Sequence, residues 1–353
     1  MTAPRSNVPS GTFVGLRGTP QATVIIPTFN GEKYISQILE SLAVQETQWD
    51  FEVLVIDSGS SDRTVERVQE HPLVRLHQIP NSEFGHGKTR NLGATLARGE
   101  YVAYLSHDAI PASPFWLHEI TKPLDPQGLN AAAVLGKQVA RPGCFPLLKY
   151  EIREVFQRFG PNYGTTLFYV DDFARSRDDV NAMAFYSDVN SATRRSFVLD
   201  VIPYQDVLYS EDMAFGLDVI EGGFIKAYAP QAVVEHSNDL TLREYRMRLF
   251  DEITGLRRIG KDLPPLRWSR QFIYPLYGAG IDSLRIVADK EMSLGSKFRW
   301  LVVNPFFHWA KWRSFYRSTH VDLNDKVLVD KGSLESARLA AAEVAPGLSQ
   351  SHR

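Results

Sequence analysis

Short apolar runs alternate with segments of helical spacing through the N-terminal third of the chain. The runs, rich in Val and Ile, lie at 22–30, 51–57, 74–79 and 101–105 and predict buried β-strands. Between the first two, the apolar residues at 34–42 recur every three or four positions, which predicts a helix. Strands that alternate with helices across short loops pair in parallel. We therefore expect an α/β fold, doubly wound in this region, with a ligand at the carboxyl ends of its strands.

Composition limits the classes of protein to consider. The chain has 353 residues, 44% of them hydrophobic, and a formal net charge of -2, which gives no reason to expect nucleic-acid binding. The single cysteine, Cys144, excludes an internal disulfide and a multi-cysteine metal site and fits a reducing compartment. No run is long enough to span a bilayer and the N-terminus lacks the apolar core of a secretory signal, so we expect a cytoplasmic protein whose membrane contact is at most peripheral.

Two of the predicted strands are followed by an acid. Asp57 closes V-L-V-I-D and can accept hydrogen bonds from a nucleotide base or ribose, although a helix N-cap or a plain turn explains D-S-G-S equally well. Asp108 follows Y-L-S-H as a single carboxylate. One carboxylate is enough to hold Mg²⁺ or Mn²⁺ where a nucleotide diphosphate supplies other ligands, and the metal would stabilise charge on a departing diphosphate. We expect Asp108 to be that ligand, with His107 or Ser106 at its edge.

The segment E-F-G-H-G-K-T-R-N-L-G, residues 83–93, combines three glycines with two basic side chains. Glycine lets the backbone approach a ligand, and Lys88 and Arg90 near a helix start could bind a diphosphate, whereas a solvated basic helix face is the structural alternative. No G-x-G-x-x-G fingerprint follows the first strand and no Walker-type loop occurs. A different device must therefore hold the ligand.

Two acids and a histidine stand out further along the chain. Glu211 and Asp212 open a predicted helix in S-E-D-M-A-F-G, where the positive end of the helix dipole alone would favour acids. His236 lies near the end of the run V-V-E-H-S, and the pattern fits a structural histidine as well as a ligand. Neither pattern decides its role by itself.

The patterns fall in one order over residues 22–250: V-I-I-P-T-F-N-G, V-I-D-S-G-S-S-D-R-T, G-K-T-R-N-L-G, L-S-H-D-A-I-P, S-E-D-M-A-F-G and V-V-E-H-S. This series resembles the inverting glycosyltransferases of family 2, which have the GT-A fold. The variants D-S-G-S, H-D-A-I-P and F-G-H-G-K-T-R-N-L-G are most similar to the rhamnosyltransferase branch, which uses dTDP-L-rhamnose. The resemblance implies a Rossmann-like mixed, mostly parallel sheet flanked by helices, with a helical C-terminal extension.

The resemblance also implies roles for individual residues. Asp57 would contact the nucleotide base, Asp108 and His236 would bind the metal, Mg²⁺ or Mn²⁺, and Asp212 would be the general base. Arg90 and Asn91 would lie along the donor. The remaining residues expected to bind the nucleotide-sugar are Pro27, Phe29, Ser58, Lys88, His107 and Glu211. One departure puts the need for a metal in question: the family's usual D-x-D is S-H-D here, with Ser106 in place of the first acid.

The implied reaction moves a sugar, L-rhamnose in the leading hypothesis, onto a cell-surface polysaccharide or a polyprenyl-linked glycan. Direct displacement by the acceptor needs no enzyme nucleophile, whereas a retaining route through a covalent intermediate would need a second acid that the sequence does not show. The same machinery with a UDP-hexose donor is the nearest alternative. A non-catalytic protein that binds glycans or nucleotide-sugars is the alternative from another class, suggested by the missing acid at Ser106.

We divide the chain into a flexible segment at 1–20, a catalytic domain at 21–245, a helical extension at 246–332 and a tail at 333–353. The catalytic domain would have a donor half at about 21–111 and an acceptor half at about 112–245.

Residues 297–317 hold five Lys or Arg, no acid and three of the six tryptophans, although Pro305 interrupts the helical pattern. Basic residues interleaved with Trp and Phe are typical of a membrane interface, here the cytoplasmic face of the inner membrane. A helix that packs its aromatic residues on the catalytic domain, or a dimer contact, is the alternative. The oligomeric state stays open.

Overall fold

The computed structural model describes residues 19–170 and 177–344. Predictions made for residues 1–18 and 345–353 lie outside the described residues. The described residues form two compact units, one of residues 19–141, 152–170 and 177–237 and the other of residues 142–151 and 238–344. The catalytic domain predicted from the sequence extends to 245, eight residues beyond the end of the first unit.

The first four strands of the first unit pair in parallel, as the alternation of strands and helices predicts. They lie in the order β3-β2-β1-β4. The strands are β1 (Ala22–Thr28), β2 (Phe51–Asp57), β3 (Arg75–Gln78) and β4 (Tyr101–Leu105), and the helices between them are α1 (Glu32–Ala43), α2 (Thr64–Gln69) and α3 (His86–Leu96).

The second half of the sheet is mostly antiparallel. β8 (Asn190–Arg194) pairs antiparallel with β4 and with β6 (Ala133–Val139), which in turn lies parallel to β9 (Lys226–Glu235). Two short strands, β5 (Ile110–Pro111) and β7 (Thr166–Phe168), pair antiparallel with β9. The predicted mixed sheet flanked by helices is confirmed, with its parallel pairing concentrated in the first four strands.

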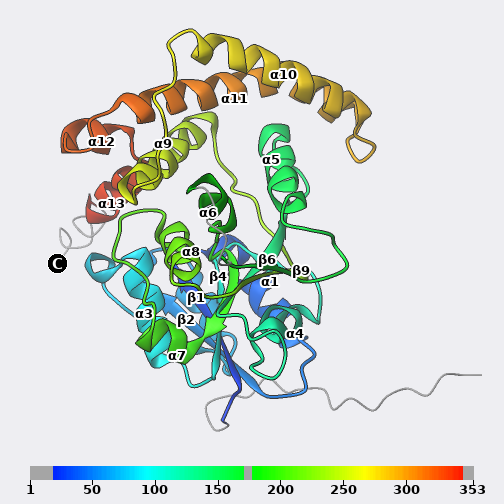
Figure 1. The fold of residues 1–353 in the computed structure, drawn as a ribbon, viewed down its shortest axis with the longest axis vertical. Helices are drawn as coiled ribbons and strands as arrows, with labels where there is room; N and C mark the ends of the chain where they lie inside the picture. Colours follow the sequence, from blue (N-terminus) through cyan, green and yellow to red (C-terminus); the bar gives the residue numbers. More distant parts are fainter. Residues whose placement is uncertain (1–18, 171–176, 345–353) are drawn as a thin grey trace, which may run out of the picture. The chain divides into compact units, whose positions relative to one another are not determined.

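The strands are buried on both sides because their side chains alternate between two cores. On β1, Val24 and Ile26 belong to one hydrophobic cluster and Ile25 to the other. Helices α1 and α4 (Trp116–Thr121) cover the first cluster, and α3, α7 (Arg195–Asp200) and α8 (Glu211–Glu221) cover the second (Figure 1). A near-continuous run of apolar residues, rather than strict alternation with polar ones, follows from burial on both faces.

The second unit is helical. It contains the start of α5 (Pro146–Gln157) and the helices α9 (Leu242–Arg258), α10 (Arg270–Ala288), α11 (Leu294–His320), α12 (Lys326–Gly332) and α13 (Leu334–Val344). A capping box between Thr241 and Glu244 begins α9, and Phe145, Tyr245 and Phe307 form the centre of a small core. The sequence pattern suggests an interruption at Pro305, but α11 continues through this residue. Among the described residues, no helix combines the length and apolar character needed to cross a membrane.

Candidate active site

The loops after β1, β2 and β4 meet at the carboxyl edge of the parallel strands. Asp57 is fully buried at the end of β2, where its carboxylate accepts hydrogen bonds from the backbone N–H groups of Gly59 and Ser60, each at 3.1 Å. The Ser58 hydroxyl donates to the Thr28 carbonyl at 3.1 Å. This geometry corresponds to the turn interpretation of Asp57, and its contact with a nucleotide base stays a prediction.

Three more of the predicted donor-binding residues lie at this edge. Pro27 is partly buried within β1, and Phe29 is partly buried directly after that strand. His107 follows β4 and lies against the start of α1, where a Cβ on Gly31 would stand 3.3 Å from the His107 ring. Contacts of Pro27, Phe29 and His107 with a donor stay predictions.

Asp108 and His236 come into direct contact. The Asp108 Oδ2 atom lies 3.4 Å from His236 Nε2, and the Ser106 hydroxyl donates to Asp108 Oδ1 at 2.7 Å. The contact follows from the sheet, because Ile110 of β5 pairs with Glu235 of β9 and so places the residues next to them side by side. Burial opposes ionisation of Asp108, but His236, His107 and Ser106 outweigh it and hold the pKa of the carboxyl well below its usual range.

Gln138, on β6, orients the His236 ring. Its side-chain nitrogen donates to the Ser187 hydroxyl at 3.1 Å, and its side-chain oxygen lies 3.1 Å from His236 Nδ1. The amide oxygen can only accept, so Nδ1 donates to Gln138, and the Nε2 atom faces the Asp108 carboxylate. To share a metal ion with the carboxylate, Nε2 would have to be unprotonated.

The donor set fits a divalent metal held partly by a diphosphate. A carboxylate and an imidazole nitrogen are protein ligands for such ions, with the Ser106 hydroxyl beside them. No group of three or more His, Cys, Asp or Glu side chains able to hold a metal occurs in the part of the chain that the structure describes. The protein side therefore offers two strong ligands, and the diphosphate of a bound nucleotide would have to complete the coordination.

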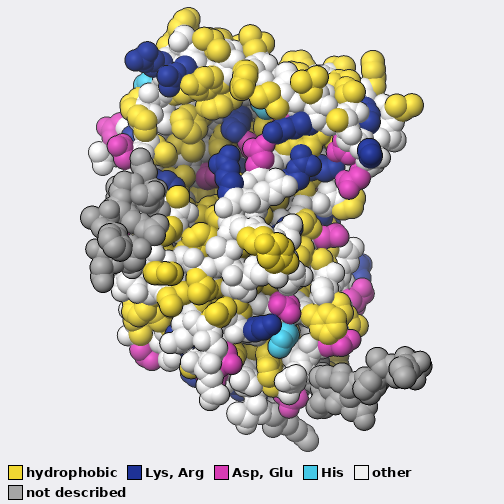
Figure 2. All heavy atoms as spheres, turned by 45° about the vertical axis from the view of Figure 1, so that its right-hand side comes forward, with side chains coloured by type: hydrophobic (Ala, Val, Ile, Leu, Met, Phe, Trp, Pro, Cys, Tyr) yellow, Lys and Arg dark blue, Asp and Glu magenta, His cyan; other side chains and the backbone are white. Residues whose placement is uncertain are grey.

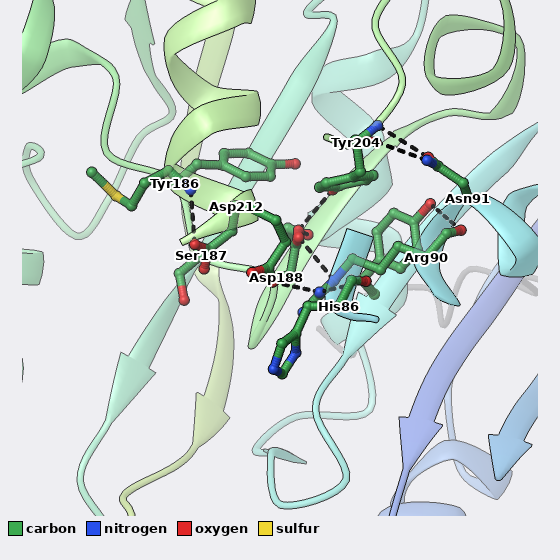
Figure 3. A network of polar contacts seen from close by, with 12 residues as sticks. His86, Arg90, Asn91, Tyr186, Ser187, Asp188, Tyr204 and Asp212 are labelled. Carbon is green, nitrogen blue, oxygen red and sulfur yellow. Dashed lines mark hydrogen bonds and ion pairs between the residues drawn. The ribbon is translucent and has the colours of Figure 1, made fainter. Parts of the chain in front are cut away.

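Arg90, on α3, lies at the centre of a buried charge cluster (Figure 3). Its Nε atom lies 2.9 Å from Asp188 Oδ2 and its Nη1 atom 2.5 Å from Glu211 Oε1. Asp188 also accepts hydrogen bonds from the Tyr204 hydroxyl at 2.8 Å and the Ser191 hydroxyl at 2.6 Å. The two ion pairs hold the start of α8 against α3 and the loop before β8.

Asp212 stands in the same cluster, beside Asp188 and Arg90 (Figure 3). Burial raises its pKa well above the usual value, and repulsion from Glu211 and Asp188 adds to this effect against the attraction of Arg90. The residue before the pair, Ser210, has a left-handed backbone with φ of 69°, a conformation that non-glycine residues seldom adopt. A carboxylate with a raised pKa is a stronger base, as proton abstraction requires.

Lys88 and Asn91 both reach the loop at 204–206. The amide of Asn91 exchanges two hydrogen bonds with the backbone of Tyr204, at 2.8 and 3.0 Å, and Lys88 forms an exposed ion pair with Asp206 at 3.0 Å. Asn91 therefore fixes the loop that carries the Tyr204 hydroxyl to Asp188. Contacts of Lys88, Arg90 and Asn91 with the donor stay predictions.

The structure adds three residues that the sequence patterns did not single out: Gln138, Asp188 and Tyr204. Asp188 stands two positions before a strand, in S-D-V-N-S, and this was the one signal that could have drawn attention to it. The hydrogen bonds of Gln138 run from His236 to the hydroxyl of Ser187, the residue before Asp188 in the chain. That the acids expected to serve metal binding and proton transfer form one site stays a prediction.

The sequence model of glycosyl transferase family 2 matches residues 23–201 of this chain. The chain belongs to glycosyl transferase family 2. It is 30% identical to the O-antigen chain rhamnosyltransferase RfbN of Salmonella typhimurium, over 65% of this chain and 70% of the relative, and 30% identical to WbaN of Salmonella anatum, over 66% and 71%. As a member of this family near its rhamnosyltransferases, the protein is an enzyme, and we set aside the alternative of a non-catalytic binding protein.

Solved structures agree on the fold of this family 2 enzyme. The mannosyltransferase PcManGT from Pyrobaculum calidifontis, in complex with GDP-Man and Mn²⁺, superposes with a TM-score of 0.53 at 17% identity, covering 89% of each chain. Staphylococcus aureus TarS 1–349 with UDP-GlcNAc superposes with a TM-score of 0.50 at 19% identity, covering 88% of this chain and 79% of TarS. At these identities the likeness shows the fold alone.

Proposed function

We propose that this glycosyltransferase moves L-rhamnose from dTDP-L-rhamnose to a hydroxyl of a cell-surface polysaccharide or of a lipid-linked glycan, with inversion at the anomeric carbon. The observation that carries the proposal is the charge cluster in which Asp212, with a raised pKa, stands beside Arg90 and Asp188, together with the contact between Asp108 and His236. The similarity to two proteins named as rhamnosyltransferases supports the choice of sugar.

In this mechanism Asp212 accepts the proton of the acceptor hydroxyl as its oxygen attacks the anomeric carbon. The bond from that carbon to the diphosphate oxygen breaks as the glycosidic bond forms, so the electron pair leaves with the diphosphate and the configuration inverts. Arg90 stabilises the ionised acids of the cluster, and Tyr204 and Ser191 keep Asp188 in place by hydrogen bonds. Proton transfer by a positioned carboxylate contributes a factor of about 10²–10⁴ in rate.

Asp108 and His236 are the residues that would hold Mg²⁺ or Mn²⁺, oriented by Ser106 and Gln138. A bound metal ion would neutralise charge on the leaving diphosphate. The structures of PcManGT with GDP-Man and Mn²⁺ and of TarS with UDP-GlcNAc support a nucleotide-sugar as the donor.

A panel of donors tests the proposal. The enzyme is incubated with dTDP-L-rhamnose, UDP-glucose, UDP-N-acetylglucosamine and GDP-mannose, and release of each nucleoside diphosphate is measured with and without divalent metal. We expect release from dTDP-L-rhamnose alone. Turnover of a UDP-sugar with none of dTDP-L-rhamnose would instead establish the alternative of a UDP-hexose donor on the same machinery.

The acceptor part of the proposal places the enzyme at the cytoplasmic face of the membrane, in contact through residues 297–317. A growing glycan on a polyprenyl carrier lies at that surface, so a peripheral contact would keep enzyme and acceptor together. Single-stranded nucleic acid, which also binds aromatic residues with arginines, does not suit the net charge of -2.

A further inference from the structure

Helices α10 and α11 expose a stripe of large apolar side chains along their length. The most exposed are Leu276 and Leu284 on α10, each 75% exposed, and Leu294 and Phe298 on α11, 84% and 74% exposed. On each helix the exposed apolar residues recur at helical spacing, and they are Ile273, Leu276, Tyr277, Leu284 and Val287 on α10 and Leu294, Phe298, Val302, Phe306 and Trp309 on α11. Figure 2 shows hydrophobic side chains gathered along the upper edge, where Figure 1 places these two helices.

The aromatic residues of α11 are divided between the inside of the unit and this surface. Phe307 and Trp300 belong to the small core around Phe145, and Trp312 packs edge to face on Tyr274 of α10. Phe298, Phe306 and Trp309 face outward. Internal packing therefore accounts for only some of the aromatic residues of 297–317.

Charge on the two helices is one-sided. They carry seven Lys and Arg and a single acid, Asp282, whereas acids slightly outnumber bases in the whole chain. Asp282 is buried and paired with His308 at 2.8 Å and with Arg285 at 3.3 Å, so it does not offset the exposed cations. At the turn between the helices, Asp289 and Glu291 are both paired with Lys149, at 2.8 and 3.0 Å.

The outward-facing arginines border the apolar stripe. Arg270, Arg299, Arg313 and Arg317 are exposed, and Arg270 lies over the Tyr274 ring. A hollow of about 280 Å³ in this region is lined by Tyr274, Tyr277, Gly278, His308, Lys311 and Trp312. Tyr and Trp rings with cations beside an apolar surface are the composition of a protein segment that lies in a lipid headgroup layer.

From this arrangement we propose that the exposed apolar stripes of α10 and α11 form one docking face for an anionic phospholipid bilayer, with both helices lying along its surface. The inference deepens the membrane contact of the proposed function and rests on it, but it adds α10, which the sequence pattern at 297–317 did not include. A second copy of the chain is a poorer occupant, because a symmetric dimer would bring two cationic borders together without acids to meet them.

Vesicle sedimentation of the full chain tests the face. The vesicles contain either phosphatidylcholine alone or phosphatidylcholine with phosphatidylglycerol. The double variants are Leu276→Glu with Leu284→Glu on α10, and Phe298→Glu with Phe306→Glu on α11. The matched control is Val44→Glu with Leu73→Glu, which adds the same charge at exposed apolar positions of the first unit. Because all these side chains are exposed, we expect the variants to fold, which circular dichroism checks.

The parent should bind only the anionic vesicles, and each helix variant should lower the partition coefficient at least about tenfold, since charge replaces apolar side chains at the interface. The control should bind as the parent does. Arg313→Gln with Arg317→Gln should lower binding roughly fivefold per cation removed, and added salt should lower it further.

Three outcomes would overturn the inference. If only the α11 variant lost binding, the face would not include α10. If no variant lost binding, the contact would lie elsewhere. If the parent ignored vesicles but formed dimers that the same variants dissociate in sedimentation velocity, the occupant would be a second copy. A wrong donor assignment would leave vesicle binding unchanged, and a wrong docking face would leave nucleotide release from dTDP-L-rhamnose unchanged, so the two failures are distinguishable.

Discussion

The two units place their charged and apolar residues in opposite ways. We call the first unit, which contains the candidate active site, the catalytic unit, and the second the helical unit. In the catalytic unit Arg90 pairs with the buried acids Asp188 and Glu211, and the strands keep their apolar side chains inside. In the helical unit α10 and α11 leave leucine and phenylalanine side chains in solvent and keep arginines around them.

The difference matters because burying a charge and exposing an apolar side chain both cost free energy. Buried charges are costly unless they are paired, so a cluster such as that around Arg90 is kept where fixed charges assist chemistry. Exposed apolar stripes of this size are costly in water and are typical of surfaces that meet a partner. The buried charges of the catalytic unit suit a polar ligand, and the docking face that we propose for the helical unit would meet an apolar one.

The largest effect is expected where the buried cluster takes part in the reaction. Asp212→Asn keeps the shape of the side chain but cannot accept a proton, so turnover should fall by about 10²–10⁴-fold while donor binding survives. Nucleotide release in the presence of acceptor gives turnover, and calorimetry gives donor affinity. Asp218→Asn, in the same helix, is the control and should leave turnover close to that of the parent. A normal rate in Asp212→Asn would assign the base to another residue.

The next effect tests the pairing of the cluster. Arg90→Gln leaves Asp188 and Glu211 buried without their cation, which should lower the free energy of unfolding by about 3–5 kcal/mol. Urea denaturation measures this value. Arg63→Gln, which breaks the exposed Arg63–Glu66 pair, should leave the urea midpoint unchanged. Equal effects of the two substitutions would contradict the distinction between buried and exposed charge in this unit.

A smaller effect on donor and metal affinity is expected at the proposed metal ligands. Asp108→Ala should weaken donor binding when Mg²⁺ or Mn²⁺ is present and make little difference after chelation. Gln138→Leu removes the acceptor that fixes the His236 ring and should lower the affinity for Mn²⁺ in the presence of nucleotide by about 10–100-fold. Calorimetry measures both. Unchanged donor affinity of Asp108→Ala with metal supplied would remove Asp108 from the site.

The smallest effect on turnover and stability is expected from a change of pH. Asp212 must be ionised to act as a base, so turnover should fall as pH drops through its raised pKa, above the range of an ordinary carboxyl. For stability the sign is reversed: the folded protein favours protonated Asp212, so the free energy of unfolding should decrease as pH rises from about 4 through that pKa. Asp212→Asn should remove part of this decrease, measured as Tm against pH. An identical Tm profile in parent and variant would mean that the pKa of Asp212 is not raised.

Much of the fold was accessible from the sequence because its signals are local. The strands at 51–57 and 101–105 and the helix at 242–258 occur at the residues that their periodicity predicts. The helix through Pro305 was the exception. The pattern alone suggests an interruption there, but α11 is continuous, and Phe307 and Ala310, which follow Pro305, pack in the small core.

The candidate site was accessible only in part. The motif order named Asp108, Asp212 and His236, but not Asp188 or Gln138, because an acid near a strand and a glutamine within one have many structural explanations. Gln138 and His236 are 98 residues apart, and Arg90 and Glu211 are 121 residues apart. No periodicity in a sequence specifies which partner such side chains meet.

The sequence by itself determined the alternation of strands and helices, and with it the carboxyl edge where Asp57 and Asp108 stand. It did so because each strand and helix is specified by residues near one another in the chain. Only the tertiary structure decided that His236 faces Asp108, that Arg90 pairs with Asp188 and Glu211, and that α10 shares its exposed apolar character with α11. These contacts depend on the pairing of β5 with β9 and on the packing of helices distant in sequence, and burial gives them their energetic weight.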